Sequence, residues 1–193
     1  MRAALIAAAC VAATGCVRDA TDQVCPDLAK GDLIVTEIGG PQTGNDLLVP
    51  WIEIYNASGD SVDLRGTRIR FRRLDGSAEI SVLVRRSLVT AAESYTVLGL
   101  DKDSMLESYL DYSFGPDYQG SWLSAAAIDV EVCGTLVNRA RYSSLPNTGS
   151  YSLGRMPPDP DATEDATKWC TDTTANGAGF PGSPQRANIA CPP

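Results

Sequence analysis

The sequence contains no histidine, and this absence removes several kinds of catalytic and metal-binding site. Serine–histidine–aspartate and cysteine–histidine mechanisms need an imidazole, and so does a zinc site with histidine ligands. Histidine is also the usual acid–base group near neutral pH. Mechanisms that use only carboxylates remain open. We therefore expect a protein that is not an enzyme and that needs no cofactor and no metal ion.

Other features are absent or scarce. The cysteines show no Cys-x-x-Cys spacing, which argues against a zinc site. No stretch has the periodicity and length of the helices in a bundle or an α/β sheet. Basic residues are in the minority, 16 against 24 acidic ones, and the net charge of −8 argues against specific or tight nucleic-acid binding. The length of 193 residues suits one domain.

The N-terminal residues predict an export signal. Arg2 precedes an alanine-rich apolar stretch that is too short to span a bilayer, so we interpret residues 1–15 as a signal peptide. Residues 13–16 (ATGC) resemble a bacterial lipobox, in which small residues precede a cysteine that is acylated and becomes the new N-terminus. The alternatives are an ordinary signal peptide cut near Ala20 and a buried alanine-rich helix.

If the lipobox is genuine, Cys16 carries the lipid and the membrane is the first partner of the chain. Two or three acyl chains, such as palmitate, anchor a protein stably, whereas one chain binds only marginally. Val17 follows the cysteine where an aspartate would favour the inner membrane, so we expect an outer-membrane lipoprotein of the cell envelope. Residues 16–30 are expected to form a polar tether, and residues 31–193 the domain.

Four cysteines remain for the domain, and an even number in an oxidising compartment predicts disulfides. These are Cys25, Cys133, Cys170 and Cys191. Three pairings are open. We favour one bond from Cys25 to Cys191, tying the two ends, and one from Cys133 to Cys170.

Short β-branched and alternating segments predict an all-β sandwich. The expected strands cover residues 32–38, 51–55, 62–71 with a bend at Gly66, 80–84, 94–99, 128–132 and 136–142. Asp75 and Gly76 have the chemistry of a hairpin turn. Residues 101–120 show no clear period and predict a long loop with at most one short helix. The region after residue 142 is rich in Pro, Gly, Asp and Thr and is expected to be a long irregular segment.

The chain resembles the lamin tail domain, an immunoglobulin-like β-sandwich that also occurs in bacterial exported proteins. The segments that carry this resemblance, in the order of the family, are residues 33–38, 51–56 (WIEIYN), 62–66 (VDLRG), 95–98, 134–139, 150–155, Trp169 and 181–188. The chain departs from the family pattern at Pro50, Thr67 and Asn138. The resemblance implies an immunoglobulin-like fold and a binding or scaffolding role without catalysis.

Several residues of these segments are expected to serve the fold. They are Trp51, Glu53, Tyr55, Asn56, Trp169 and Asn188. The carboxylate of Glu53 and the amide of Asn56 lie near a strand end and a turn, where they would bond backbone N–H groups. The two tryptophans would supply buried area, and Asn188 would tolerate an unusual backbone conformation. The alternative is that Trp51, Glu53 and Asn56 form a functional site.

A row of arginines is the most specific candidate for a binding surface. Seven arginines fall within residues 65–86, and those expected to form the row are Arg68, Arg70, Arg72 and Arg85. Alternate residues of a strand share a face, so this row predicts a docking surface for an anionic polysaccharide, lipopolysaccharide or an acidic protein. The alternative is a solvated strand face on which acids such as Asp63, Asp75 and Glu79 pair with the arginines.

Three further patterns indicate binding or catalysis more weakly. An acidic loop (Asp159, Asp161, Glu164 and Asp165) offers oxygens to calcium but is more typical of a solvated loop. An aromatic group (Tyr109, Tyr112, Tyr118 and Trp122) predicts either a sugar-stacking platform or a packing cluster, and we favour packing. The rival enzyme hypothesis is a carboxylate-based hydrolase that uses Glu37 and Glu53.

Overall fold

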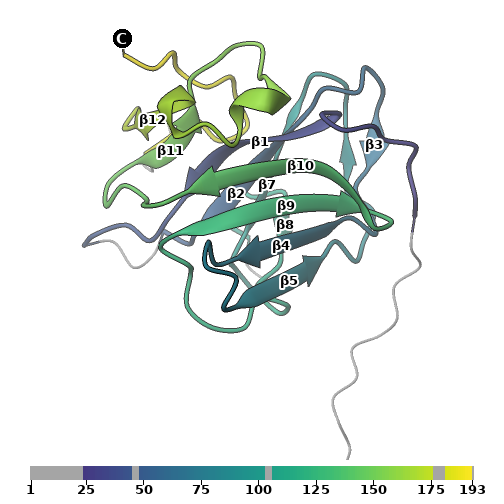
Figure 1. Ribbon diagram of the computed structural model, residues 1–193, viewed down its shortest axis with the longest axis horizontal. Helices are drawn as coiled ribbons and strands as arrows, with labels where there is room; N and C mark the ends of the chain where they lie inside the picture. Colours follow the sequence, from purple (N-terminus) through teal and green to yellow (C-terminus); the bar gives the residue numbers. More distant parts are fainter. Residues whose placement is uncertain (1–23, 45–47, 103–105, 176–180, 193) are drawn as a thin grey trace, which may run out of the picture.

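Two β-sheets packed face to face form the body of the domain, which confirms the all-β sandwich (Figure 1). The computed structural model describes residues 24–44, 48–102, 106–175 and 181–192. The six-stranded sheet has the order β12-β11-β1-β2-β7-β8, and the four-stranded sheet has the order β10-β9-β4-β5. A small third sheet pairs β3 with β6. All pairs are antiparallel except β7 with β8.

The strands of the six-stranded sheet are β12 (Trp169–Asp172), β11 (Ser150–Leu153), β1 (Leu33–Gly39), β2 (Trp51–Asn56), β7 (Tyr95–Gly99) and β8 (Tyr112–Ser113). Those of the four-stranded sheet are β10 (Thr135–Tyr142), β9 (Ala126–Val132), β4 (Arg68–Arg72) and β5 (Glu79–Leu83). The small sheet consists of β3 (Val62–Asp63) and β6 (Val89–Thr90).

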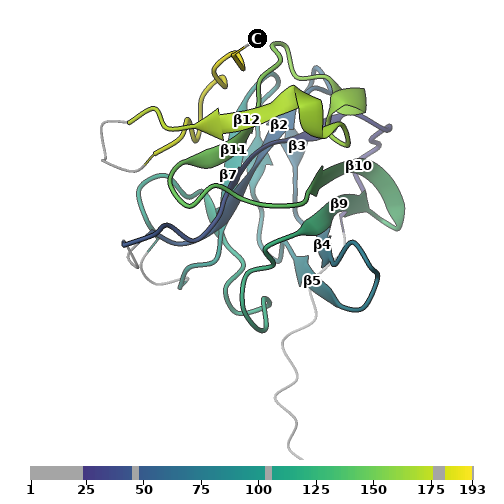
Figure 2. The ribbon, with the colours of Figure 1, turned by 60° about the vertical axis from the view of Figure 1, so that its left-hand side comes forward.

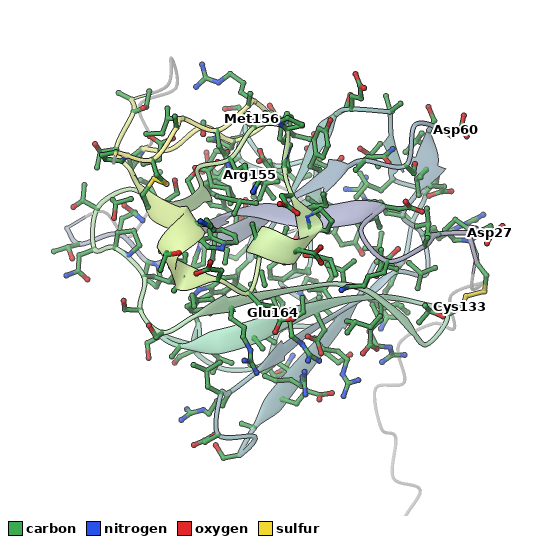
Figure 3. The ribbon with its side chains drawn as sticks, turned by 45° about the horizontal axis from the view of Figure 1, so that its top comes forward. Asp27, Asp60, Cys133, Arg155, Met156 and Glu164 are labelled. Carbon is green, nitrogen blue, oxygen red and sulfur yellow. A yellow bond between two sulfur atoms is a disulfide. The ribbon has the colours of Figure 1, made fainter. Side chains whose placement is uncertain are left out.

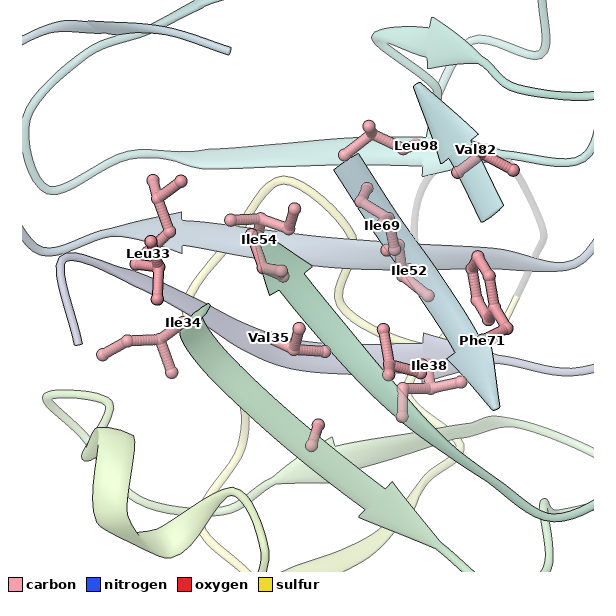
Figure 4. Packing of buried hydrophobic residues seen from close by; sticks show 14 of the residues in the cluster. Leu33, Ile34, Val35, Ile38, Ile52, Ile54, Ile69, Phe71, Val82 and Leu98 are labelled. Carbon is pink, nitrogen blue, oxygen red and sulfur yellow. The ribbon is translucent and has the colours of Figure 1, made fainter. Parts of the chain in front are cut away.

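The main core lies between the two large sheets, where apolar side chains at alternate strand positions meet (Figure 4). Ile52 and Ile54 of β2 and Ile69 and Phe71 of β4 are all completely buried. Burying a side chain of this size stabilises the folded state by about 1.5–3 kcal/mol. The alternate apolar residues of β2 and β4 therefore point into the same core, as the sequence pattern predicts.

β1 and β2 are buried along their whole length because both of their faces are covered. One face contacts the four-stranded sheet. Over the other face, Trp51 packs in a separate cluster with Val97, Tyr109 and Leu110. The C-terminal residues cover the rest of this outer face and lie beside β11 and β12 in the view of Figure 2.

The expectation that the region after residue 142 is irregular was only partly right, because β11 and β12 belong to the six-stranded sheet. β11 was missed because its buried positions include Ser150 and Ser152 instead of apolar residues. Residues 101–120 contain the short strand β8, and residues 62–71 divide into β3 and β4.

The described helical segments are two 3₁₀ turns, Pro160–Ala162 and Ala166–Lys168. Neither has the length or the apolar composition of a membrane-spanning helix. Each follows an aspartate whose side chain accepts a hydrogen bond from a backbone N–H of the turn, Asp159 in the first case and Asp165 in the second.

The four predicted cysteines form two disulfides, but the favoured pairing was wrong. Cys25 pairs with Cys133, and Cys170 pairs with Cys191, with Cα–Cα distances of 5.7 and 5.6 Å. The reason is topological. The segment before β1 runs beside the β9–β10 turn that contains Cys133, as Figure 3 shows near Asp27.

The second disulfide holds the C-terminal segment against the edge of the six-stranded sheet. Cys170 lies on β12, and Cys191 returns past β11 so closely that a Cβ on Gly154 would sit 2.1 Å from its Sγ atom. Glycine is therefore required at position 154. The predicted signal peptide, residues 1–15, and the lipidation site Cys16 lie outside the described residues, as does most of the tether predicted at residues 16–30.

Candidate functional site

Two glutamates, Glu37 of β1 and Glu53 of β2, are direct cross-strand partners on the outer face of the six-stranded sheet. Their pairing depends on a β-bulge in β1. Val35 pairs with Ile54, and the next pair joins Glu37 with Glu53, so Thr36 is the extra residue. The bulge brings the side chain of Thr36 beside Glu53 as well, where its hydroxyl donates to Glu53 Oε1 at 2.7 Å.

Every carboxylate oxygen of this pair accepts a hydrogen bond. Glu37 Oε1 accepts from the Ser150 hydroxyl and from the backbone N–H of Ser183 at 3.0 Å, while the Ser183 hydroxyl donates to Oε2 at 3.3 Å. Glu53 Oε2 accepts from the backbone N–H of Gln185 at 2.7 Å. Two of these donors are backbone groups of the C-terminal segment, so the glutamates hold that segment on the sheet.

A third carboxylate, Asp172 of β12, extends this network. The Ser183 hydroxyl lies 2.9 Å from Asp172 Oδ2 and 3.3 Å from Asn188 Oδ1. The Asn188 amide then donates to the carbonyls of Thr36, at 2.7 Å, and Leu153, at 3.1 Å. We call Glu37, Glu53, Asp172, Ser183 and Asn188 the carboxylate cluster.

The close fit of the C-terminal segment requires glycine at position 182. Its φ of +113° is unfavourable for other residues, and a Cβ there would meet Ser150 Oγ at 2.7 Å and Glu37 Oε1 at 2.9 Å. The adjacent Ser183 then directs both its N–H and its hydroxyl toward Glu37.

Burial dominates the electrostatics of the cluster. Both glutamates and Asp172 have no exposed surface, and no described lysine or arginine forms an ion pair with them. Burial raises the pKa of Glu37 to about 7, and the charge of Asp172 adds to this effect. Burial also raises the pKa of Glu53 well above its usual range, with a contribution from the charge of Glu37. The pair therefore favours a protonated form.

A pair of carboxyl groups with raised pKa values has the chemistry of a general acid and base, but this one has no access to a substrate. A small hollow on the same face of the sheet, lined by Trp51, Tyr109 and Pro181 among others, has a volume of about 10 Å³, which is the space of a single water molecule. In the part of the chain that the structure describes, no cluster of three or more acidic, cysteine or histidine residues has the geometry to hold a metal ion.

The other residues expected to serve the fold are buried, and Tyr55 is the most exposed of them at 9%. Asn56 Oδ1 accepts from the N–H of Ser58 at 3.0 Å, and its amide donates to the carbonyls of Asp60, Thr90 and Ala91. This is the turn role expected for Asn56. The rings of Tyr55 and Tyr95 pack 4.9 Å apart, and Trp169 stacks on Tyr151 at 5.0 Å.

For Asn188 the expected role was wrong. Its backbone does not adopt the left-handed conformation, and its contribution comes from the side-chain amide that joins the C-terminal segment to β1 and β11. Trp51, Glu53 and Asn56 do not converge on one site, because Asn56 bonds its own turn while Glu53 belongs to the carboxylate cluster.

The arginine row lies on the outward face of the four-stranded sheet, where acids accompany it. Arg70 contacts Glu79 at 2.6 Å and Glu131 at 2.8 Å, and this contact raises the pKa of its guanidinium. Arg72 Nη2 lies 2.6 Å from Asp129, which also binds Arg139. These pairs match the alternative of a solvated, ion-paired strand face, with Glu79 as expected. Arg68 is exposed and donates to the Ser81 hydroxyl at 3.1 Å.

Arg85 does not extend this row, contrary to the sequence expectation. β5 ends at Leu83, so Arg85 lies beyond the strand, and its guanidinium binds Asp117 at 3.1 Å. The same Asp117 carboxylate accepts from the N–H of Leu83 at 3.3 Å, next to the end of the strand. The charged network extends instead toward the other edge of the sheet, where Arg139 of β10, not expected from the sequence, binds Asp129.

The acidic loop is used locally. Asp159 and Asp165 cap the two 3₁₀ turns, and Glu164, labelled in Figure 3, lies 3.4 Å from the guanidinium of Arg141. The three tyrosines of the aromatic group are buried, which matches a packing cluster more than a sugar platform. Trp122 is only partly buried and stacks on Tyr118 at 5.4 Å.

Two of the five members of the carboxylate cluster, Asp172 and Ser183, were not expected from the sequence, and neither was the backbone donor of Gln185. The one available signal was the pair of polar residues, Thr36 and Glu37, in an otherwise apolar strand. Comparison with known proteins adds no assignment: no family model matches the chain, and no curated protein matches it.

Proposed function

We propose that the chain is a lipoprotein of the cell envelope, anchored to the outer membrane through acylated Cys16, whose domain is a non-catalytic binding or scaffolding module. The proposal joins the lipobox-like residues 13–16 with the disulfide that fixes Cys25 to the domain. Only residues 17–24 separate the two cysteines, a reach of at most about 30 Å when extended. The domain would therefore stay near the membrane surface.

We also propose that the domain is lamin-tail-like. Most of the segments that carry the resemblance fall on strands of the sandwich in their expected order, while residues 181–188 lie in the irregular C-terminal segment. Residues 33–38 belong to β1, residues 51–56 form β2, and residues 95–98 belong to β7. Trp169 begins β12 and is buried in the core. This placement supports the immunoglobulin-like assignment, although the sheet order alone does not identify a family.

The observation that carries the non-catalytic proposal is the closure of the carboxylate cluster. All four oxygens of Glu37 and Glu53 accept hydrogen bonds, and neither side chain has any exposed surface. A glycoside hydrolase needs its two carboxylates in an open cleft with room for substrate. The raised pKa of Glu37 favours the hydrolase alternative, but the covering segment argues against it.

Docking of an anionic polymer on the arginine row is a weaker second candidate. Arg70 and Arg72 already pair with Glu79, Glu131 and Asp129, so a polyanion would have to compete with these carboxylates. The Arg70–Glu79 pair is partly exposed and contributes little energy, so a polyanion could compete for Arg70 at low ionic strength. Arg72 is held more firmly because its partner Asp129 is almost completely buried.

Anchoring is tested by expressing the full chain in a Gram-negative host supplied with alkyne-tagged palmitate. We expect label on the wild-type protein and its recovery with outer membranes after density fractionation. Cys16→Ser is the matched control, which should lose the label and appear in the periplasmic fraction. Equal labelling of both proteins, or a wild-type protein without label, would refute the anchor.

A further inference from the structure

A hollow at the far end of β9 from Cys133 has the composition of a sugar-binding site. It has a volume of about 320 Å³ and lies between the β4–β5 hairpin and the residues that lead into β9. Figure 1 shows this hairpin turn and the start of β9 at the same end of the molecule. The residues that matter are Arg73, Leu74, Asp75, Ser121, Trp122 and Ser124. Ligand pockets begin at about this size, which suits a single sugar ring.

One wall of the hollow is preformed. Trp122 stacks on Tyr118 at 5.4 Å and packs edge-on against Phe71 at 5.3 Å. The following residue, Leu123, is fixed at both backbone groups: its N–H donates to the Tyr118 hydroxyl at 3.3 Å, and its carbonyl accepts from the Tyr142 hydroxyl at 2.8 Å. A ligand would therefore meet an aromatic wall that needs no ordering, which lowers the entropic cost of binding.

The polar groups of the hollow are available to a ligand. Arg73, the residue after β4, forms no ion pair within the described residues, whereas Arg70 and Arg72 of β4 each bind carboxylates. Ser121 and Ser124 are exposed. Asp75 is exposed, accepts from the N–H of Ser77 at 2.9 Å and also interacts with the Ser77 side chain and the nearby charge of Arg73. These groups offer donors and acceptors on the same side as the aromatic wall.

The charges of the lining cancel, since Arg73 and Asp75 are its only charged residues. A cationic or anionic ligand would gain from one of them and be repelled by the other. A neutral ligand rich in hydroxyl groups hydrogen-bonds to both, and a pyranose ring also offers an apolar face to tryptophan. The hollow therefore differs in ligand preference from the arginine row, which suits polyanions.

The position of the hollow also fits a binding role. β9 runs from Ala126, beside the hollow, to Val132, next to the disulfide that clamps the tether. A strand of this length spans roughly 20 Å. If Cys16 is anchored, the hollow is on the side of the domain away from the point of attachment.

We propose that this hollow binds a neutral pyranose ring of an envelope or extracellular glycan, with Trp122 as the wall and Arg73 and Asp75 as hydrogen-bonding groups. The inference deepens the proposed binding function and rests on it. The full chain with Cys16→Ser, purified from the periplasm, is titrated calorimetrically with maltohexaose, cellohexaose and chitohexaose. A Kd of about 1 mM or tighter is expected for at least one of them.

The variants are chosen to keep the fold. Arg73→Ala and Asp75→Asn alter exposed side chains, and each should weaken binding at least tenfold with an unchanged melting temperature. Trp122→Phe keeps an aromatic wall and should weaken binding several-fold. Arg68→Ala is the matched control, because it removes an exposed arginine at the other end of β4, outside the hollow, and it should bind as the parent does.

Binding of none of the three oligosaccharides overturns the proposal, as does unchanged binding by Arg73→Ala and Asp75→Asn. Tighter binding of oligogalacturonate than of every neutral oligosaccharide overturns the neutral ligand class. The palmitate experiment is independent of these titrations. A labelled, membrane-bound protein without sugar affinity would leave the anchored module standing and remove only this site.

Discussion

Glu37 and Glu53 face each other across β1 and β2, fully buried, with the backbone N–H groups of Ser183 and Gln185 bonded to them. This arrangement places two carboxyl groups side by side, and no lysine or arginine of the described residues pairs with either. It is stable because burial favours the protonated form and because hydroxyl and backbone donors satisfy the oxygens. The cluster thus fastens the C-terminal segment and also links the stability of the domain to pH.

The first prediction concerns that pH dependence. The folded protein holds the Glu37 proton more tightly than the unfolded chain, in which its pKa is 4.5, so this contribution to stability is fully present below pH 4.5. It is lost as the pH rises through about 7. The loss should be on the order of 2–3 kcal/mol.

Urea unfolding from pH 4.5 to 8 measures this effect. Glu37→Gln mimics the protonated side chain and should flatten the decline in the free energy of unfolding over that range. Glu107→Gln changes an exposed carboxyl group and should leave the decline in place. Parallel curves for the wild type and Glu37→Gln would show that Glu37 is not the titrating group.

The second prediction concerns the bridge made by Asn188. Asn188→Ala removes the donors for the buried carbonyls of Thr36 and Leu153, and a buried acceptor without a partner costs about 1–3 kcal/mol. We expect a loss of about 2–4 kcal/mol in the free energy of unfolding. Arg186→Ala, an exposed change in the same segment, should cost less than about 0.5 kcal/mol. A small loss for both variants would contradict the bridge.

The third prediction separates paired from unpaired charges on the arginine row. Asp129 is almost completely buried and binds both Arg72 and Arg139, so Asp129→Ala leaves two guanidiniums without their carboxylate. It should destabilise the protein by about 1–3 kcal/mol in urea unfolding. Arg68→Ala should change stability by no more than about 0.5 kcal/mol. Equal effects of the two variants would show that the network is energetically unimportant.

The fourth prediction concerns the disulfides. Proteolysis without reduction, followed by mass spectrometry, should recover peptides that join Cys25 with Cys133 and Cys170 with Cys191. Replacing Cys170 and Cys191 together by alanine should cost about 3 kcal/mol, as expected for a loop with a sequence separation of 21. A peptide that joins Cys25 with Cys191 would contradict the structure.

Where local sequence determines structure, the sequence predictions were close. β2 was predicted within one residue of its bounds because it is rich in β-branched and aromatic residues and because Asn56 begins a turn. The Asp75-Gly76 hairpin followed from the conformational preferences of those two residues. In both cases the determining interactions lie within a few residues of each other in the chain.

Features that depend on distant segments were not predictable in this way. A one-residue bulge at Thr36 decides which β1 side chain meets Glu53, and nothing local identifies it. The disulfide partners of Cys25 and Cys191 depend on which strands the two ends run beside. Ser183 became part of the cluster only because the C-terminal segment folds back over β1.

The central claim is that the buried glutamates fasten the C-terminal segment instead of acting on a substrate, and amide hydrogen exchange tests it most directly. The account predicts that the amides of Ser183 and Gln185 are protected nearly as strongly as those of β2, and that Glu53→Ala, which removes the acceptor of the Gln185 N–H, selectively lowers protection at Gln185. Rapid exchange of both amides in the wild-type protein would contradict the account. The segment would then open readily, and the two carboxyl groups would be accessible to a substrate.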